Sequence, residues 1–384
     1  MRSLRNGALC GIALLFVSLW TGFSAQSQTA EEWRKIGKNA WNEKKPVEAE
    51  KAYRAAVKAD PYSDKALYDL GWLLNDLRRY TDAENVFADV VAKQGKLSAD
   101  NYKEYGYALY KQNRYDDAIV QYKNANRDII PDPVALRMLG QCADGKNDRN
   151  LAKYYYQQAV KYRPSYYSAW YDLGYLYNAE GKYDSAITAL NAAAKNKQTR
   201  EVYNELGFAF YKLKNAAVAL MYYDSSLVIE PKQSTAYKGK GDVYRVVYSP
   251  ANGEKAMQAY QTAISYYPEG QGAGAWYGLG WSYNSLSRFD EAMVALDKAM
   301  LLEPDLKLAY VEYGYALYKK GRYEQAEQRL LKAKSMSGAV SGPGLYYLGL
   351  VQFELGKRSD FNNTITLLET VNPKYADMLR KKWN

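Results

Sequence analysis

Two segments of this chain, EYGYALYKQNRYDDA (104–118) and EYGYALYKKGRYEQA (312–326), begin with the same eight residues. Both then continue with an Arg-Tyr pair and an alanine at matching places. A chain of 384 residues that repeats a phrase of this length contains internal repeats, so the period of the repeat decides the fold.

Alignment of the two segments on their glycines reveals the period. Ten glycines follow one another at intervals of 33 to 35 residues, apart from one interval of 39: Gly37, Gly71, Gly106, Gly140, Gly174, Gly207, Gly241, Gly280, Gly314 and Gly349. Ten copies in phase indicate ten structural repeats.

Each repeat carries further residues in register with its glycine. An alanine stands twelve residues after most of the glycines, and Ala256 takes this place in the seventh repeat after a three-residue insertion: Ala49, Ala83, Ala118, Ala152, Ala186, Ala219, Ala292 and Ala326. A bulky residue such as Tyr53 or Phe87 follows four positions later, and many repeats close with a proline such as Pro61.

These positions predict a helical hairpin in every repeat. Apolar residues recur at helical spacing on both sides of a Gly-, Asn- and Asp-containing turn. We expect the glycine and the alanine to face each other, because small side chains let two helices approach closely. Proline ends the second helix. A single hairpin cannot bury its apolar face, so the hairpins are expected to stack as a solenoid.

The pattern resembles the tetratricopeptide repeat. The residues that carry the resemblance in the first and fifth repeats are Trp33, Gly37, Ala49, Tyr53, Ala56 and Pro61, and Trp170, Gly174, Tyr177, Ala186 and Ala193. The resemblance implies an all-α, right-handed solenoid of ten repeats over residues 28–384. The tenth repeat departs most, with Phe361 in place of the alanine, and residues 375–384 resemble a polar capping helix.

The first 27 residues have the features of a secretory signal peptide. Two arginines precede an apolar stretch, and Ala25-Gln26-Ser27 fits a cleavage site. A membrane anchor is the alternative, although the apolar stretch is short for a span. We expect export to the periplasm or cell surface of a bacterium, with no membrane span after cleavage.

Composition argues against several functions. The chain contains no histidine, and only Cys142 remains after the expected cleavage, at a core position. The net charge is +10, and the basic residues are scattered among acidic ones, so nucleic acid is not an expected partner. We expect no catalytic residues, no metal site and no cofactor.

Forty tyrosines call for a separate explanation. Tyr80, Tyr115, Tyr183, Phe289 and Tyr323 stand in the turns, where we expect them to wedge between neighbouring hairpins. A joint is expected at 248–274, where the seventh repeat has extra residues and EGQGAG follows. We expect limited proteolysis to cut there first.

A second set points away from the packing face. Residues three before, one after and four after each glycine share one side of the first helix. In the family this side lines a concave groove, and aromatic and basic side chains suit recognition. The predicted ligand-binding residues are Tyr68, Trp72, Lys103, Tyr107, Tyr110, Arg137, Tyr171, Tyr175, Asn178, Phe208, Tyr211, Lys238, Tyr277, Trp281 and Tyr315.

The sequence leaves the groove's role open. We expect it to dock a protein or peptide partner, so that the protein acts as a scaffold without enzymatic activity. Glycan or peptidoglycan binding is the alternative, because exposed Tyr and Trp rings also stack on sugars. A second alternative is that these side chains simply pack on one another inside a tight superhelix.

Overall fold

A computed structural model describes residues 28–127, 130–247, 249–267, 272–336 and 342–383. Over these residues all regular secondary structure is helical, with twenty-one α-helices and no strand. The expected all-α fold is therefore confirmed. The predicted signal peptide, residues 1–27, lies outside the described residues. The helices divide into two compact units, of which the first ends at Asp128.

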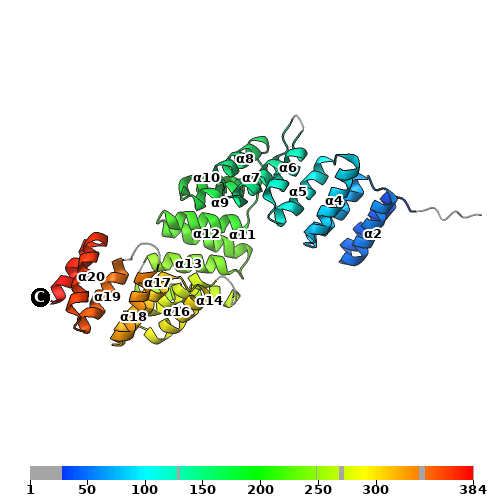
Figure 1. Cartoon of the computed structure of the whole chain (residues 1–384). Helices are drawn as coiled ribbons and strands as arrows, with labels where there is room; N and C mark the ends of the chain where they lie inside the picture. Colours follow the sequence, from blue (N-terminus) through cyan, green and yellow to red (C-terminus); the bar gives the residue numbers. More distant parts are fainter. Residues whose placement is uncertain (1–27, 128–129, 248, 268–271, 337–341, 384) are drawn as a thin grey trace, which may run out of the picture. The chain divides into compact units, whose positions relative to one another are not determined.

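The first unit consists of three hairpins. Consecutive helices pair as α1 with α2, α3 with α4 and α5 with α6. In chain order the helices are α1 (Ala30–Asn42), α2 (Pro46–Ala59), α3 (Asp64–Asp76), α4 (Tyr80–Gln94), α5 (Ala99–Lys111) and α6 (Tyr115–Ala125), the first of them in blue and the last in cyan-green in Figure 1.

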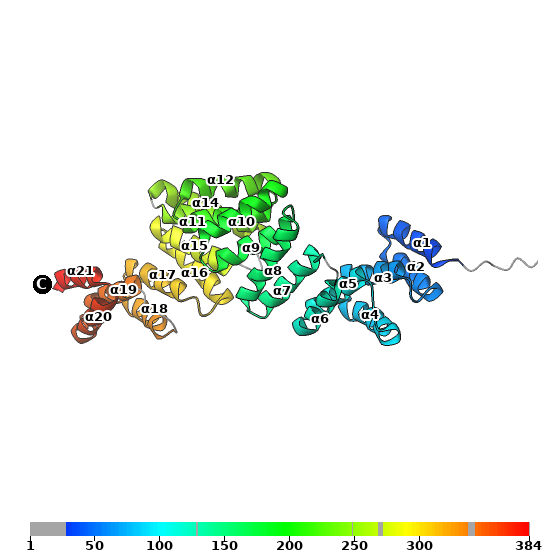
Figure 2. The same cartoon turned by 90° about the horizontal axis from the view of Figure 1, so that it is seen from above.

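The second unit contains seven hairpins and one further helix. Its helices are α7 (Pro133–Gly145), α8 (Arg149–Tyr162), α9 (Tyr167–Ala179), α10 (Tyr183–Asn196), α11 (Arg200–Lys212), α12 (Ala216–Ile229), α13 (Ser234–Val246), α14 (Pro250–Tyr266), α15 (Ala273–Ser285), α16 (Phe289–Leu302), α17 (Lys307–Lys319), α18 (Tyr323–Ser335), α19 (Gly342–Glu354), α20 (Arg358–Val371) and α21 (Pro373–Trp383). Helix α21 packs on α19 and α20 at the C-terminal end (Figure 2), over the segment for which a capping helix is expected.

The hairpin turn is the same in nine of the ten repeats. Seven residues after the repeat glycine, one residue adopts the left-handed conformation, with φ between 59° and 74°. Glycine occupies this place at Gly181, Gly321 and Gly356 without steric cost, whereas residues such as Arg78 and Asn113 adopt it elsewhere. The shared turn fixes how the second helix of each hairpin returns along the first.

Close packing between the two helices depends on the repeat glycine. The residue sixteen positions later, Tyr156 in the case of Gly140, lies where a side chain on the glycine would be. A Cβ atom at Gly140 would be 2.5 Å from Cε1 of Tyr156, which is 3% exposed. The same arrangement is formed by Tyr53, Phe87, Tyr122, Leu190, Tyr223, Leu296 and Leu330, and by Tyr260 in the seventh repeat.

The expectation that glycine and alanine face each other needs correction. The alanines are fully buried, and the backbone oxygens of Ala186 and Ala292 do lie near Gly174 and Gly280. The nearest neighbour of the glycine is nevertheless the bulky side chain four residues after the alanine. A large group therefore fills the space that the glycine opens, and the alanine allows the second helix to lie close enough for this contact.

The insertion in the seventh repeat lengthens a helix. Helix α14 has 17 residues, and Ser249 caps its start, because the Ser249 hydroxyl accepts a hydrogen bond from the Asn252 amide at 3.2 Å. Residues 248 and 268–271 of the expected joint lie outside the described residues. Preferential proteolysis at 248–274 stays a prediction.

We expect Gly140→Ala to destabilise the second unit, because the new methyl group must displace the enclosed Tyr156 ring. Overpacking of this kind costs about 1–3 kcal/mol. Gly274→Ala is the matched control in the same unit, since its Cβ would meet only the flexible end of Lys238. Its effect should be neutral or slightly stabilising, as alanine is the better helix former. Thermal melts followed by circular dichroism compare the two variants, and equal melting temperatures would refute the packing argument.

Candidate binding groove

The first helices of successive repeats contact one another directly. In the second unit α9, α11, α13, α15, α17 and α19 form such a series, and in the first unit α1, α3 and α5 do so. Equivalent side chains on these helices therefore recur from repeat to repeat. We define the inner row as the aromatic residues directly after the repeat glycines: Trp72, Tyr107, Tyr175, Phe208, Trp281 and Tyr315.

Members of the inner row differ in exposure. Tyr175 is 51% exposed, and its ring lies 6.5 Å from that of Tyr171. The other five members are half-buried. Tyr175 is thus the inner-row ring most available to a ligand.

Three of the five turn aromatics contact the next repeat as predicted, whereas the rings of Tyr115 and Tyr323 pair with those of Tyr110 and Tyr318 in their own hairpins. Ring centroids are 6.3 Å apart for Tyr80 and Tyr107, 6.3 Å for Tyr183 and Phe208, and 6.2 Å for Phe289 and Tyr315, always edge to face. Each pair joins the turn of one repeat to the inner row of the next. The turn position before Tyr175 is occupied instead by Arg149. The inner row is consequently part scaffold and part open surface.

The predicted residues of the first unit are aromatic and basic, and most of them have a partner within that unit. Trp72 meets Trp41 at 5.4 Å, and Tyr110 meets Tyr115 at 5.7 Å. Tyr68 is 38% exposed. Two lysines also make contacts in this unit. The ammonium of Lys103 forms an ion pair with Asp100 at 2.7 Å, and the ammonium of Lys111 lies 5.4 Å from the ring of Tyr107.

Asn178 belongs to the scaffold and not to the ligand surface. Its amide nitrogen donates to the backbone oxygen of Glu205 at 3.1 Å and to the Glu205 carboxylate at 2.8 Å, and the residue is only 5% exposed. Asn75 binds Glu104 in the same way, and Asn284 binds Glu312. The prediction for Asn178 was wrong because the next repeat covers this side chain.

Arg137 also contacts the next repeat. Its Nε atom donates a hydrogen bond to the Asp172 carboxylate at 2.6 Å. In the first unit, the Nε atom of Arg34 donates to the Asp69 carboxylate at the same distance. The acceptors in both arrangements stand two residues before a repeat glycine. We refer to these as the inter-repeat carboxyls: Asp69, Glu104, Asp172, Glu205 and Glu312. Their constant position in the sequence was the signal that could have revealed them.

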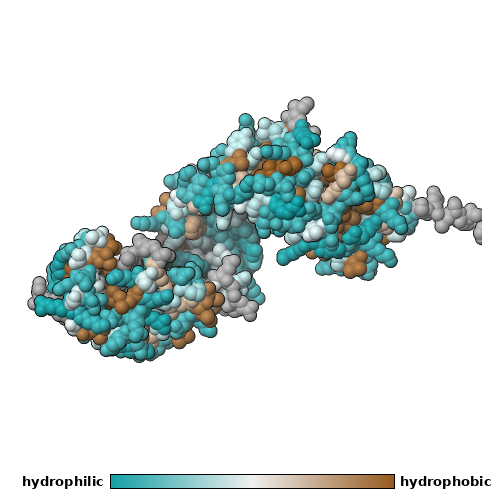
Figure 3. Space-filling view, in the orientation of Figure 1, coloured by the Kyte–Doolittle hydropathy of each residue, from teal (hydrophilic) through white to brown (hydrophobic). Residues whose placement is uncertain are grey.

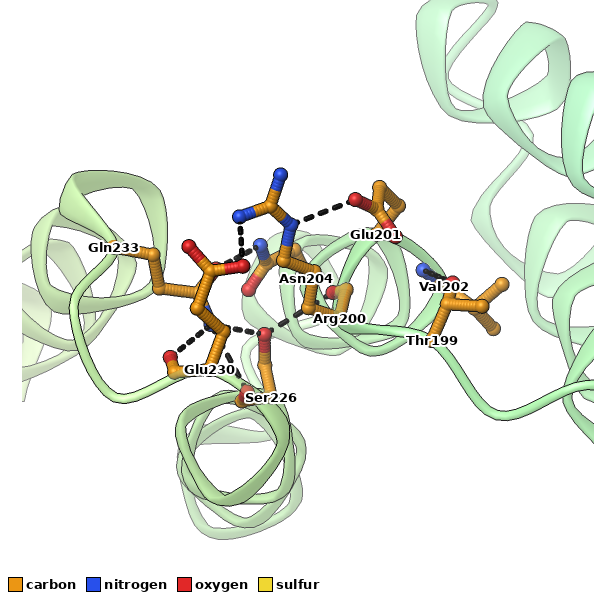
Figure 4. A network of polar contacts seen from close by, with 8 residues as sticks. All are labelled: Thr199, Arg200, Glu201, Val202, Asn204, Ser226, Glu230 and Gln233. Carbon is orange, nitrogen blue, oxygen red and sulfur yellow. Dashed lines mark hydrogen bonds and ion pairs between the residues drawn. The ribbon is translucent and has the colours of Figure 1, made fainter. Parts of the chain in front are cut away.

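Two of the predicted ligand-binding residues, Tyr171 and Lys238, line one hollow of about 640 Å³ in the second unit. Asn204 also lines it, and all three residues stand three positions before a repeat glycine. The rest of the lining includes Arg200, Tyr266 and Tyr267 and the acidic side chains of Glu201, Glu205 and Glu230. One wall is a polar network (Figure 4) in which Asn204 donates to Gln233 at 2.9 Å, and Gln233 donates to Ser226. Arg200 pairs with Glu230 in the same network.

The seventh and eighth repeats bring together a cation and several rings. The guanidinium of Arg245 lies 5.6 Å from the ring of Tyr277 and 5.8 Å from that of Trp281. Its Nε atom is buried without a hydrogen-bond partner among the described residues. Burial raises the pKa of the Tyr277 hydroxyl to about 12, so this ring stays neutral at physiological pH.

Asp242 replaces an aromatic residue in the inner row and is neutralised locally. It accepts hydrogen bonds from Lys238 and from the Tyr260 hydroxyl, both at 2.7 Å. One repeat earlier, Lys212 lies 5.3 Å from the ring of Phe208 and 5.8 Å from that of Tyr211, which is half-buried. Aromatic rings and cationic side chains therefore lie together here, and the carboxylate of Asp242 is hydrogen-bonded to Lys238 and Tyr260.

Other kinds of site find no support in the described part of the chain. No cluster of three His, Cys, Asp or Glu side chains there could hold a metal ion. None of the described helices combines the length and apolar character needed to cross a membrane. Apolar side chains lie scattered among polar ones on the face seen in Figure 3. Burial raises the pKa of the Cys142 thiol to about 12, which suits a core residue and not a nucleophile.

The sequence profile of the tetratricopeptide repeat matches residues 34–96, 68–132, 137–201, 179–235 and 273–306. Together these matches cover more than half of the chain, which therefore belongs to the tetratricopeptide-repeat family. The resemblance drawn from the glycine spacing is confirmed.

Curated relatives include subunits of large complexes. The anaphase-promoting complex subunit cut9 of Schizosaccharomyces pombe is 27% identical over 162 residues, which are 41% of this chain and 24% of that protein. The BBSome complex member BBS4 homologue of Drosophila melanogaster is 29% identical over 42% of this chain and 34% of its own length. The human protein O-mannosyl-transferase TMTC3 is 26% identical over 50% of this chain and 22% of its length. The chain thus spans about a quarter to a third of these relatives.

Two solved structures share the fold. The Cut9–Hcn1 hetero-tetramer structure aligns with a TM-score of 0.56 and 17% identity, covering 84% of this chain and 76% of that one. A tetratricopeptide repeat protein from Parabacteroides merdae aligns with a TM-score of 0.50 and 16% identity, covering 65% and 97%. Tetratricopeptide-repeat proteins generally act as protein-interaction scaffolds.

We expect Glu312→Gln to stabilise the protein at alkaline pH and not at acidic pH. Burial raises the pKa of Glu312 from 4.5 to about 7, against the opposing effects of Asn284 and Arg245. The stabilisation linked to its protonated form is complete below pH 4.5 and is lost as the pH rises through 7. Glutamine stays neutral at every pH, and its side-chain oxygen can still accept the hydrogen bond from the Asn284 amide.

The gain at pH 8.5 should be on the order of 1–3 kcal/mol and should vanish towards pH 4.5. Denaturant titrations at the two pH values measure it, with the exposed Glu303→Gln as control. A stability difference that is the same at both pH values would contradict the assignment.

Proposed function

We propose that this protein is an exported, non-enzymatic scaffold of a bacterial cell envelope that binds a protein or peptide along the aromatic face of its first helices. The observation that carries the proposal is the half-exposed ring of Tyr175, which lies beside Tyr171 and is not covered by a turn aromatic. Exposed aromatic side chains of this kind dominate binding energies at protein interfaces.

The comparisons support a protein-interaction scaffold in general, without indicating the partner or the binding surface. Two of the relatives are by name members of multi-subunit complexes. TMTC3 is named a transferase, but this chain spans only 22% of its length, so the match supplies no argument for catalysis. The aromatic groove, the export and the identity of the partner are our inference from the residues of this chain.

Replacement of Tyr175 by alanine tests the groove. Tyr154→Ala is the matched control, because Tyr154 is 54% exposed but lies on α8, a second helix. Both variants should melt within a degree or two of the parent protein, since exposed substitutions change stability by roughly 0.5 kcal/mol or less. Capture of a partner from the cell envelope should weaken about tenfold or more only in Tyr175→Ala. Equal capture by both variants would reject the groove as the binding surface.

Export predicts a shortened chain. When the full-length gene is expressed in a Gram-negative bacterium, the protein should accumulate in the periplasmic fraction and begin at Gln28. Mass spectrometry of the intact protein measures the loss of residues 1–27. A chain of full length in the cytoplasmic fraction would overturn this part of the proposal.

A further inference from the structure

One type of hydrogen bond between neighbouring repeats recurs in every third repeat. An asparagine four residues after the repeat glycine donates from its amide nitrogen to the glutamate carboxylate of the following repeat, at 2.8 or 2.9 Å. The bonds link the second repeat to the third, the fifth to the sixth and the eighth to the ninth: Asn75 with Glu104, Asn178 with Glu205 and Asn284 with Glu312. The glycine period does not require this pattern, so the chain has a second, longer period.

Ring contacts follow the same longer period. The edge-to-face pairs between a turn aromatic and the inner row join the same three pairs of repeats, with ring centroids 6.2 or 6.3 Å apart. The first three repeats also form one of the two compact units, which ends at Asp128. We therefore divide the repeats into three modules of three repeats and a terminal tenth repeat. The modules are α1–α6, α7–α12 and α13–α18.

Each module carries a lysine at the same place in its third repeat, five residues after the repeat glycine. These module lysines are Lys111, Lys212 and Lys319, and no other repeat has a basic residue at this position. All three are exposed, and the aromatic residues directly after the glycine and four residues after it are half-buried in all three modules. The longer period thus includes a charged group that faces solvent and contributes nothing to the core.

Aromatic rings lie beside the module lysines without neutralising their charge. The ammonium of Lys111 lies 5.4 Å from the ring of Tyr107 and 5.9 Å from that of Tyr110. The ammonium of Lys212 lies 5.3 Å and 5.8 Å from the rings at the same two positions of its repeat. The ninth repeat has tyrosine at both positions. In the part of the chain that the structure describes, none of the module lysines forms an ion pair. Each therefore offers an unneutralised charge to an anionic group.

Charge favours an acidic occupant. The net charge of the chain is +10, and a basic protein attracts acidic partners before direct contact is made. A carboxylate can accept a charge-assisted hydrogen bond from each module lysine. Apolar side chains next to that carboxylate would contact the exposed parts of the neighbouring rings. A neutral glycan or a basic peptide would leave the three ammonium groups without a counter-charge.

We infer that the chain has three equivalent binding sites, one in the third repeat of each module, and that each site takes one acidic segment of a partner protein. The inference rests on the proposed protein-binding function and adds the charge of the partner and the number of its segments. Each site consists of a module lysine and two aromatic residues: Tyr107, Tyr110 and Lys111; Phe208, Tyr211 and Lys212; Tyr315, Tyr318 and Lys319. One chain thus gathers three copies of the same segment.

Titration calorimetry on the full chain counts the sites. The probe is a decapeptide that contains Glu and Leu among Gly and Ser, and the control probe has Gln in place of each Glu. About three Glu peptides should bind per chain with one affinity. The Gln peptide should bind about tenfold more weakly, because it lacks the hydrogen bond between two charged groups.

Substitution of single lysines tests the assignment of the sites. Lys111→Ala, Lys212→Ala and Lys319→Ala should each remove one binding equivalent and leave the affinity of the remaining sites unchanged. Lys123→Ala is the matched control, because Lys123 is also exposed but lies on α6, a second helix. This control should keep all three equivalents. Thermal melts followed by circular dichroism establish that each variant is folded.

Several outcomes would overturn the inference. Binding of a single Glu peptide per chain would indicate one continuous site, and equal binding of the Gln peptide would show that charge is not recognised. Unchanged stoichiometry in all three module-lysine variants would assign the longer period to packing alone. If Tyr175→Ala abolishes capture of the protein partner but the Glu peptide does not bind, the scaffold function stands and the acidic-segment inference is wrong. If three Glu peptides bind but Tyr175→Ala still captures the partner, the three sites stand and the groove around Tyr175 is rejected.

Discussion

In eight of the ten repeats, the contact between the repeat glycine and the bulky side chain sixteen residues later determines how closely the two helices of a hairpin approach. At Gly140 no Cβ atom fits beside Tyr156. This contact sets the distance between the two helices and the rotation of the first helix about its axis. It therefore also determines which residues of the first helix face away from the hairpin. Because eight repeats use this contact, and Tyr260 makes it in the seventh, the residues on this side recur from repeat to repeat as the inner row.

The same rings also join neighbouring repeats. Tyr223 fills the space at Gly207 in its own repeat and at Gly239 in the next, and Tyr260 does so at Gly241 and Gly278. Gly239 and Gly278 stand where other repeats carry an inter-repeat carboxyl. Repeats are thus joined either by a buried carboxyl that accepts hydrogen bonds or by a ring that needs a glycine. Tyrosine suits the second arrangement because it buries a ring and can still place its hydroxyl on a polar partner, as Tyr260 does on Asp242.

The sequence predicted more of the fold than of the groove, for a physical reason. A glycine period of about 34 residues and apolar residues at helical spacing specify the hairpin, its turn and its direction of packing. Tyr175, which helical periodicity places on the outward side, is 51% exposed in the structure, whereas Tyr171 is half-buried. Helical periodicity could not indicate that the following repeat covers Asn178, because a residue at the margin of a helix face is exposed or buried according to its neighbour's side chain. The expected contact between the repeat glycine and the alanine failed for a similar reason. Spacing alone does not show whether the alanine or the bulky residue four positions later lies nearer to the glycine.

The seventh repeat combines three departures from the pattern, and the structure links them. Gly239 replaces an inter-repeat carboxyl, so the ring of Tyr223 can reach across from the sixth repeat. Asp242 replaces an inner-row aromatic and takes hydrogen bonds from Lys238 and Tyr260. Arg245, on the same helix, lies near the rings of Tyr277 and Trp281, and its Nε atom is buried. Where the aromatic series is interrupted, the structure therefore places a cation beside the rings of the next repeat.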